Sequence, residues 1–258
     1  MTAQTTHNQP DPFAAYSTID EQELEQLRHD QAWIAHPIYR ASEQIKTTPF
    51  FQWVRELKDP QAFKPAALPL YYHSATFPKV MGLMLGLTPM SENFMMPFYA
   101  RHANGEADHH QLLMTWMLKH KLLNKPEEIN DFAPNAETNA CVNYAYQMAI
   151  EQDREKWLVG LNSGIERCSN DFFKALSPKF HELGVGDVYF DVHVEADEHH
   201  SIMGLKYIPS YDPQSSRGQT LILKALEGIE LWGRMINSWI GEDVQCKFDL
   251  QGNLIKSS

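Results

Sequence analysis

Residues 189–201, "YFDVHVEADEHHS", place histidine and carboxylate side chains at a regular spacing. His193, Asp197 and His200 follow one another at i, i+4 and i+7. On a helix that advances about 100° per residue, these three side chains fall within an arc of roughly 60°. The neighbouring His199 lies roughly 120° from His193 and should point elsewhere. The stretch therefore predicts a helix that carries one narrow stripe of potential metal ligands.

An earlier stretch, "ARHANGEADHH" from residue 100 to 110, repeats the same spacing with His102, Glu106 and His109. His110 sits about 80° from His102, at the margin of the stripe. A single His/Glu pair on a helix is usually a solvated surface feature. Two triplets with identical spacing, each flanked by apolar residues, favour a shared buried site on two helices.

The ligand types suit a non-haem metal site. Imidazole and carboxylate without cysteine favour iron or manganese over a structural zinc site. Zinc, or a histidine network without metal, remains an alternative. Cys141, Cys168 and Cys246 lie far apart and form no CxxC pair, which argues against a zinc ribbon or a disulfide framework. Cys168 is interpreted as a small buried hydrophobe, with a nucleophile as the alternative.

The bulk composition limits the partners. The chain has 258 residues and a net charge of −11, which argues against nucleic acid or an anionic membrane as the main partner. The N-terminus shows no basic segment followed by an apolar one, so no signal peptide is visible. The longest apolar stretch, around residues 79–87, is too short to span a bilayer. We therefore expect a cytoplasmic protein with no membrane partner.

The pattern along the chain is helical throughout. No stretch alternates as a strand would, and no repeat is evident. We expect a single all-α domain of about seven to nine helices over residues 19–241, with a loose arm at 1–18 and a tail at 242–258. Residues 137–183 could form two helices broken near Gly160 to Gly164. The Ser-Ser pair at 215–216 could cap the final helix.

His-x3-Asp-x2-His, as in His193, Asp197 and His200, resembles the late-helix motif of the haem-oxygenase-like superfamily, and within it of the non-haem di-iron oxidases and oxygenases. Glu106 and His109 match the Glu-x2-His of the earlier metal helix in that branch. His102 departs from the pattern, because it stands where another form of the motif has a glutamate. The resemblance covers most of residues 30–240, but only the late motif is specific.

The resemblance implies a haem-oxygenase-like helical bundle with Fe(2+), two ions per chain, or manganese instead. It also implies a bridging glutamate upstream of the late motif, for which Glu166, Glu155 and Glu151 are the candidates. Glu166 is preferred, because the helix beyond it runs on to the turn before residue 188. The predicted metal ligands are therefore His102, Glu106, His109, Glu166, His193, Asp197 and His200.

The function that follows from the resemblance is an O2-dependent non-haem di-iron oxidoreductase that acts on a small metabolite. The alternatives are a thiaminase-like or quinone-synthase-like member of the same fold, and a metal-binding protein without turnover. A haem oxygenase with His36 as the proximal ligand would leave the triplets unexplained. The final helix either helps to build a homodimer or covers the core. The residues expected to line the pocket are Tyr71, Tyr72, His73, Met84, Phe94, Phe98 and Tyr144.

Overall fold

A computed structural model describes residues 21–255, and this part of the chain is helical, with a single isolated β-bridge and no strand. The expected all-α fold is confirmed. The α-helices are α1 (Glu21–Asp30), α2 (Ala32–Ile45), α3 (Pro49–Glu56), α4 (Lys64–Leu87), α5 (Met96–Gly105), α6 (His109–Lys119), α7 (Ala136–Glu151), α8 (Arg154–Trp157), α9 (Arg167–Glu182), α10 (Val188–Met203) and α11 (Ser216–Ser238).

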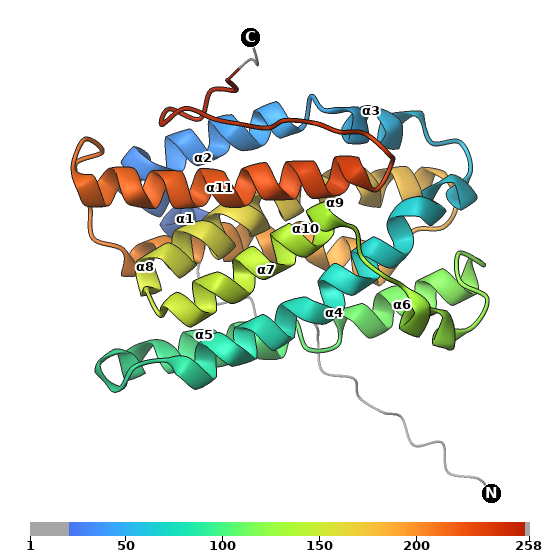
Figure 1. Cartoon of the computed structure of the whole chain (residues 1–258), viewed down its shortest axis with the longest axis horizontal. Helices are drawn as coiled ribbons and strands as arrows, with labels where there is room; N and C mark the ends of the chain where they lie inside the picture. The colour runs from blue at the N-terminus through green and yellow to red at the C-terminus, as the bar shows by residue number, and fades with distance from the viewer. Residues whose placement is uncertain (1–20, 256–258) are drawn as a thin grey trace, which may run out of the picture.

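The helices form a layered bundle around one central segment. Helix α11 lies beside α2 along one side, and α4 and α5 lie along the opposite side (Figure 1). The π-helix η4 (Leu158–Glu166) contacts α11, α10, α9 and α7, and all nine of its residues are buried. Local π-helical geometry is rare and appears frequently at functional sites. We therefore expect a functional site at the centre of the bundle.

The break expected near Gly160 to Gly164 is wrong. The chain turns instead at Gln152, whose φ of 54° is left-handed, and Asp153 then accepts a hydrogen bond from the backbone N–H of Lys156 to cap α8. The glycines serve close packing rather than interruption. A Cβ on Gly164 would lie 2.8 Å from the carbonyl oxygen of Ala225 in α11.

We call the triplet that comes first along the chain the first triplet: His102, Glu106 and His109. The single helix expected around it is divided into two. Helix α5 ends at Gly105, Asp108 has a non-helical φ of −121° and ψ of 0°, and α6 begins at His109. Asn104 and Gly105 are both poor helix formers, which gives a local reason for the interruption. The three residues therefore do not share two turns of one helix, contrary to the wheel argument.

The predicted start of the last helix and the two predicted terminal segments lie toward the ends of the chain. Ser215 caps α11, as expected, because its Oγ accepts from the backbone N–H of Gly218 at 3.1 Å. Residues 242–255 lie along α2, where the Gln44 side chain donates to the carbonyl of Gly252 and accepts from the N–H of Leu254. The arm expected at residues 1–18 lies outside the described residues. Within 21–255 no helix is long and apolar enough to cross a bilayer.

Substitution of Gly164 by alanine tests the close packing of η4 on α11. The added Cβ would clash with backbone, so Gly164→Ala should lower the free energy of unfolding by about 1–3 kcal/mol. Gly82→Ala is the matched control, because nothing lies within 4 Å of a Cβ on this exposed residue of α4. That substitution should raise stability by roughly 0.5–1 kcal/mol. Equal effects of the two substitutions in urea unfolding would contradict the packing.

Candidate metal centre

Helix α10 carries the later of the two triplets, which we call the second triplet, as the helical wheel predicts. His193, Asp197 and His200 are all buried on one face of the helix. His199 is partly exposed and directs its Nδ1 to the carbonyl of Glu195 on its own helix. The spacing therefore selects the correct histidine of the pair for a buried site.

The first triplet converges despite the broken helix. His102 near the end of α5, Glu106 in the link and His109 at the start of α6 are all buried. His109 Nδ1 lies 2.9 Å from Glu106 Oε2. His110 is only half-buried and places its ring against the edge of Tyr71. The choice of His109 over His110 thus agrees with the structure, although the local geometry is a link and not a helical stripe.

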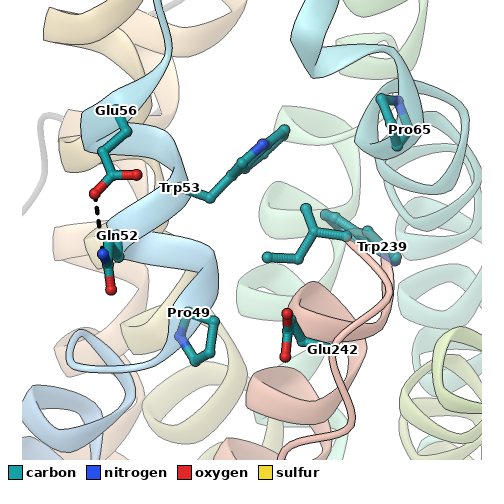
Figure 2. A pocket seen from close by; sticks show the side chains of 8 residues that line it. Pro49, Gln52, Trp53, Glu56, Pro65, Trp239 and Glu242 are labelled. Atoms are coloured by element: carbon teal, nitrogen blue, oxygen red, sulfur yellow. Dashed lines mark hydrogen bonds between the residues drawn. The ribbon is translucent and has the colours of Figure 1, made fainter.

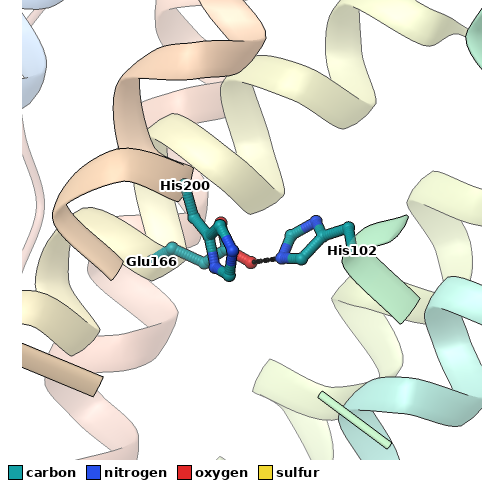
Figure 3. Close-up of side chains that lie close together, drawn as sticks. All are labelled: His102, Glu166 and His200. Carbon is teal, nitrogen blue, oxygen red and sulfur yellow. Dashed lines mark ion pairs between the residues drawn. The ribbon is translucent and has the colours of Figure 1, made fainter. Parts of the chain in front are cut away.

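Glu166, the last residue of η4, is the upstream glutamate that reaches this cluster. Its Oε1 lies 2.8 Å from Nε2 of His102, and the ring of His200 lies beside the pair (Figure 3). The other two candidates lie elsewhere. Glu155 accepts hydrogen bonds from Arg217 and Tyr211, and Glu151 is exposed and pairs with a lysine.

The structure brings all seven predicted residues into one buried cluster. Three sets of ligand atoms lie within 4.8 Å of one another, and these sets are His102–Glu166–His200, Glu106–His109–His193 and Glu106–Asp197–His200. Glu106 belongs to two sets. Its Oε2 is 4.0 Å from Nε2 of His193, and its Oε1 is 3.7 Å from Nδ1 of His200. The carboxylate shared between sets is therefore Glu106, whereas the resemblance implies that Glu166 is the bridge.

The cluster is short of positive charge. Its three carboxylates form ion pairs with histidines only, among the described residues. Burial raises the pKa of Asp197 well above its usual value, and the charges of Glu106 and Glu166 raise it further. Burial also lowers the pKa of His193 to about 3, with a further contribution from His109. Both shifts show that the protein alone does not stabilise these groups in their charged forms.

Two buried carboxylate oxygens of the cluster also lack a partner. Glu106 Oε1 and Asp197 Oδ2 have no hydrogen-bond partner among residues 21–255. Buried polar atoms are nearly always paired, since an unpaired one costs about 1–3 kcal/mol. Four imidazoles and three carboxylates on facing helices are also the donor set of di-iron and di-manganese carboxylate sites. The residues present therefore fit a pair of divalent cations.

Sequence reasoning missed the residues that orient the ligands. His193 Nδ1 donates to the backbone carbonyl of Tyr189 at 2.6 Å, which leaves Nε2 free to bind a metal. The ring of Phe173 stacks on His193 with centroids 4.2 Å apart. Asn162 Nδ2 donates to Glu166 Oε2 at 2.8 Å. A polar residue in the apolar run "LVGLNSGIE" was the available signal for Asn162, whereas Phe173 carried none.

A small cavity of about 20 Å³ adjoins the cluster. Of the residues expected to line a pocket, only His73 lines this one. Burial lowers the pKa of His73 to about 4, although the charge of Glu106 raises it. The His73 ring is therefore neutral. A larger surface pocket of about 420 Å³ lies between α3, the start of α4 and the end of α11, with Trp53 and Trp239 in its wall (Figure 2). That pocket shares no residue with the cluster and contains no histidine.

Comparison with known proteins identifies the class. The sequence model of a family described as "Iron-containing redox enzyme" matches residues 67–233, and the chain belongs to this family. The chain also has the fold of a TenA homologue from Pseudomonas syringae pv. tomato str. DC3000, with a TM-score of 0.64 at 15% sequence identity over 84% of this chain and 91% of the other. Both findings confirm the resemblance to the haem-oxygenase-like superfamily. A comparison with curated proteins finds no match.

The adjacent histidines of α10 provide a matched test of metal binding. His200→Ala removes a side chain from two of the three ligand sets and should weaken Fe(2+) binding by more than about tenfold. His199→Ala, one position away and partly exposed, should bind as the parent protein does. Anaerobic equilibrium dialysis measures both affinities. Equal affinities in the two variants would contradict the assignment.

Proposed function

We propose that this chain is an O2-dependent non-haem di-iron oxidoreductase that acts on a small metabolite. One observation supports the proposal most strongly: buried histidine and carboxylate atoms form three overlapping sets, two of which share Glu106, in a chain that belongs to a family of iron-containing redox enzymes. The cluster lies at the centre of the bundle, where water is largely excluded and charges interact strongly.

The ligand sets suggest how two ions would be held. Glu106, His109 and His193 would hold one ion. His102, Glu166 and His200 would hold the other, with Asp197 beside it, and Glu106 would lie between the two. Two divalent cations against three carboxylates would leave a net charge of +1, and they would compensate the Asp197 carboxylate, whose charged form the protein itself does not stabilise. Bound iron supplies the electrons for dioxygen reduction, which protein side chains do not provide.

The chain's own residues would keep the ligands in place and the site dry. The carbonyl of Tyr189 holds the His193 ring with Nε2 toward the cluster, and Phe173 covers one face of that ring. Asn162 fixes one oxygen of Glu166, so the other oxygen faces His102. Such partners typically change metal affinity or activity by 10- to 100-fold, as an order of magnitude.

The thiaminase-like alternative is supported by the likeness to the TenA homologue, which concerns the fold alone. A hydrolysis of that kind needs a cysteine nucleophile beside a carboxylate. All three cysteines are buried, and burial raises the pKa of the Cys168 thiol well above its usual value, with a further contribution from Asp171. None of them lines the cavity beside the cluster. The oxidoreductase proposal therefore uses the residues that this cluster contains, and the alternative does not.

An anaerobic iron titration tests the proposal. The apo-protein is titrated with ferrous iron and then exposed to oxygen while absorbance and Mössbauer spectra are recorded. We expect about two irons per chain, antiferromagnetically coupled after oxidation, and a transient visible band. His193→Ala and Asp197→Ala should each reduce the iron uptake, because each removes a ligand.

The remaining outcomes separate the alternatives. Absence of iron uptake, with unchanged behaviour of both variants, would overturn the proposal and favour a metal-independent activity. Two irons that oxidise once and never turn over with any reductant would favour a metal-binding protein. Manganese uptake in place of iron under the same conditions would correct the metal and keep the ligands.

A further inference from the structure

The small cavity beside the cluster has a second polar wall that the proposed metal ligands do not use. Helix α4 contributes His73 to it, and α11 contributes Trp232. The same lining contains Glu106, Glu166, His193 and Asp197. A molecule in this cavity would therefore lie beside both the metal cluster and the side chains of His73 and Trp232.

His73 is held firmly but makes no hydrogen bond to the described protein. Its ring stacks on Phe77 with centroids 5.4 Å apart and meets Trp232 edge-on at 5.0 Å. It is 8% exposed, and neither ring nitrogen makes a hydrogen bond within residues 21–255. Trp232 Nε1 is buried and also unpaired within the same range. Both residues line the same cavity, so their unpaired N–H groups are the candidate donors to an occupant that accepts hydrogen bonds.

The size and the walls of the cavity limit the occupant. About 20 Å³ admits one water-sized or diatomic molecule, whereas pockets for metabolites usually measure about 300–1,000 Å³. Most of the remaining wall is apolar: Leu70, Phe77, Ile165 and Phe173. The polar residues of the lining offer the two to four partners that a water requires, so water can occupy the cavity in the resting protein. A diatomic molecule that accepts hydrogen bonds as it gains negative charge fits the same volume and can displace that water.

We propose that this cavity is where dioxygen meets the cluster, and that the N–H groups of His73 and Trp232 are the donors that orient it. The inference rests on the proposed oxidoreductase function. Donors fixed by packing at the place where charge develops stabilise that charge without reorganisation. His73 acts here as a positioning residue and not as a metal ligand, since it belongs to none of the three ligand sets.

Nitric oxide, a diatomic that binds ferrous iron, is the probe for this site. His73→Leu keeps the bulk of the side chain and removes the donor, while His73→Gln keeps a donor. Trp232→Phe removes the indole N–H and retains an aromatic ring. His120→Leu is the matched control, because His120 packs against Trp116 at the end of α6 and lies outside the cavity.

The anaerobic, iron-loaded proteins are titrated with nitric oxide after their iron content has been measured. We expect the parental iron content in every variant, a nitric oxide affinity weaker by about threefold to tenfold in His73→Leu and Trp232→Phe, and an affinity near the parental one in His73→Gln and His120→Leu. Unchanged affinity in both His73→Leu and Trp232→Phe would overturn the inference. Loss of iron in both His73 variants would also overturn it, because His73 would then be a ligand. A parent protein that binds no iron would instead refute the proposed function, and the inference with it.

Discussion

The rest of this structure depends on one constraint: three buried carboxylates have only histidines as ionic partners within residues 21–255. An uncompensated charge in a protein interior costs several kcal/mol, as an order of magnitude, and groups in that position change their pKa instead. Asp197 and His193 both shift toward their neutral forms for this reason. A pair of divalent cations would remove the cause of the shifts, so we interpret the cluster as built for metal.

The helices are arranged to bring that cluster together. The π-helix η4 is buried along its whole length and packs so closely on α11 that a Cβ on Gly164 would overlap the Ala225 carbonyl. Glu166 ends the same segment, two residues beyond Gly164, and lies 2.8 Å from His102. The interruption between α5 and α6 has a similar role, because it lets Glu106 and His109 approach α10 from a short link. Irregular backbone thus occurs where the ligands are, at some cost in regular helical hydrogen bonding.

The sequence was informative where spacing along one element determines geometry. The triplet of α10 could be predicted because a continuous helix places i, i+4 and i+7 on one face. The first triplet was predicted with the correct residues but the wrong local structure, since Gly105 and Asp108 interrupt the helix. For the upstream glutamate, the sequence offered three candidates and only a weak reason to prefer Glu166. Its position, like that of His73, depends on packing between helices far apart in the chain, which one sequence does not encode in any local pattern.

The most direct test of the central claim is anomalous X-ray diffraction at the iron edge from crystals of the iron-loaded protein. We expect two peaks separated by about 3.5–4 Å, with Glu106 between them. One peak should lie beside His109 and His193, and the other beside His102, Glu166 and His200. A single peak, or iron bound away from these residues, would contradict a di-iron centre built on the shared carboxylate.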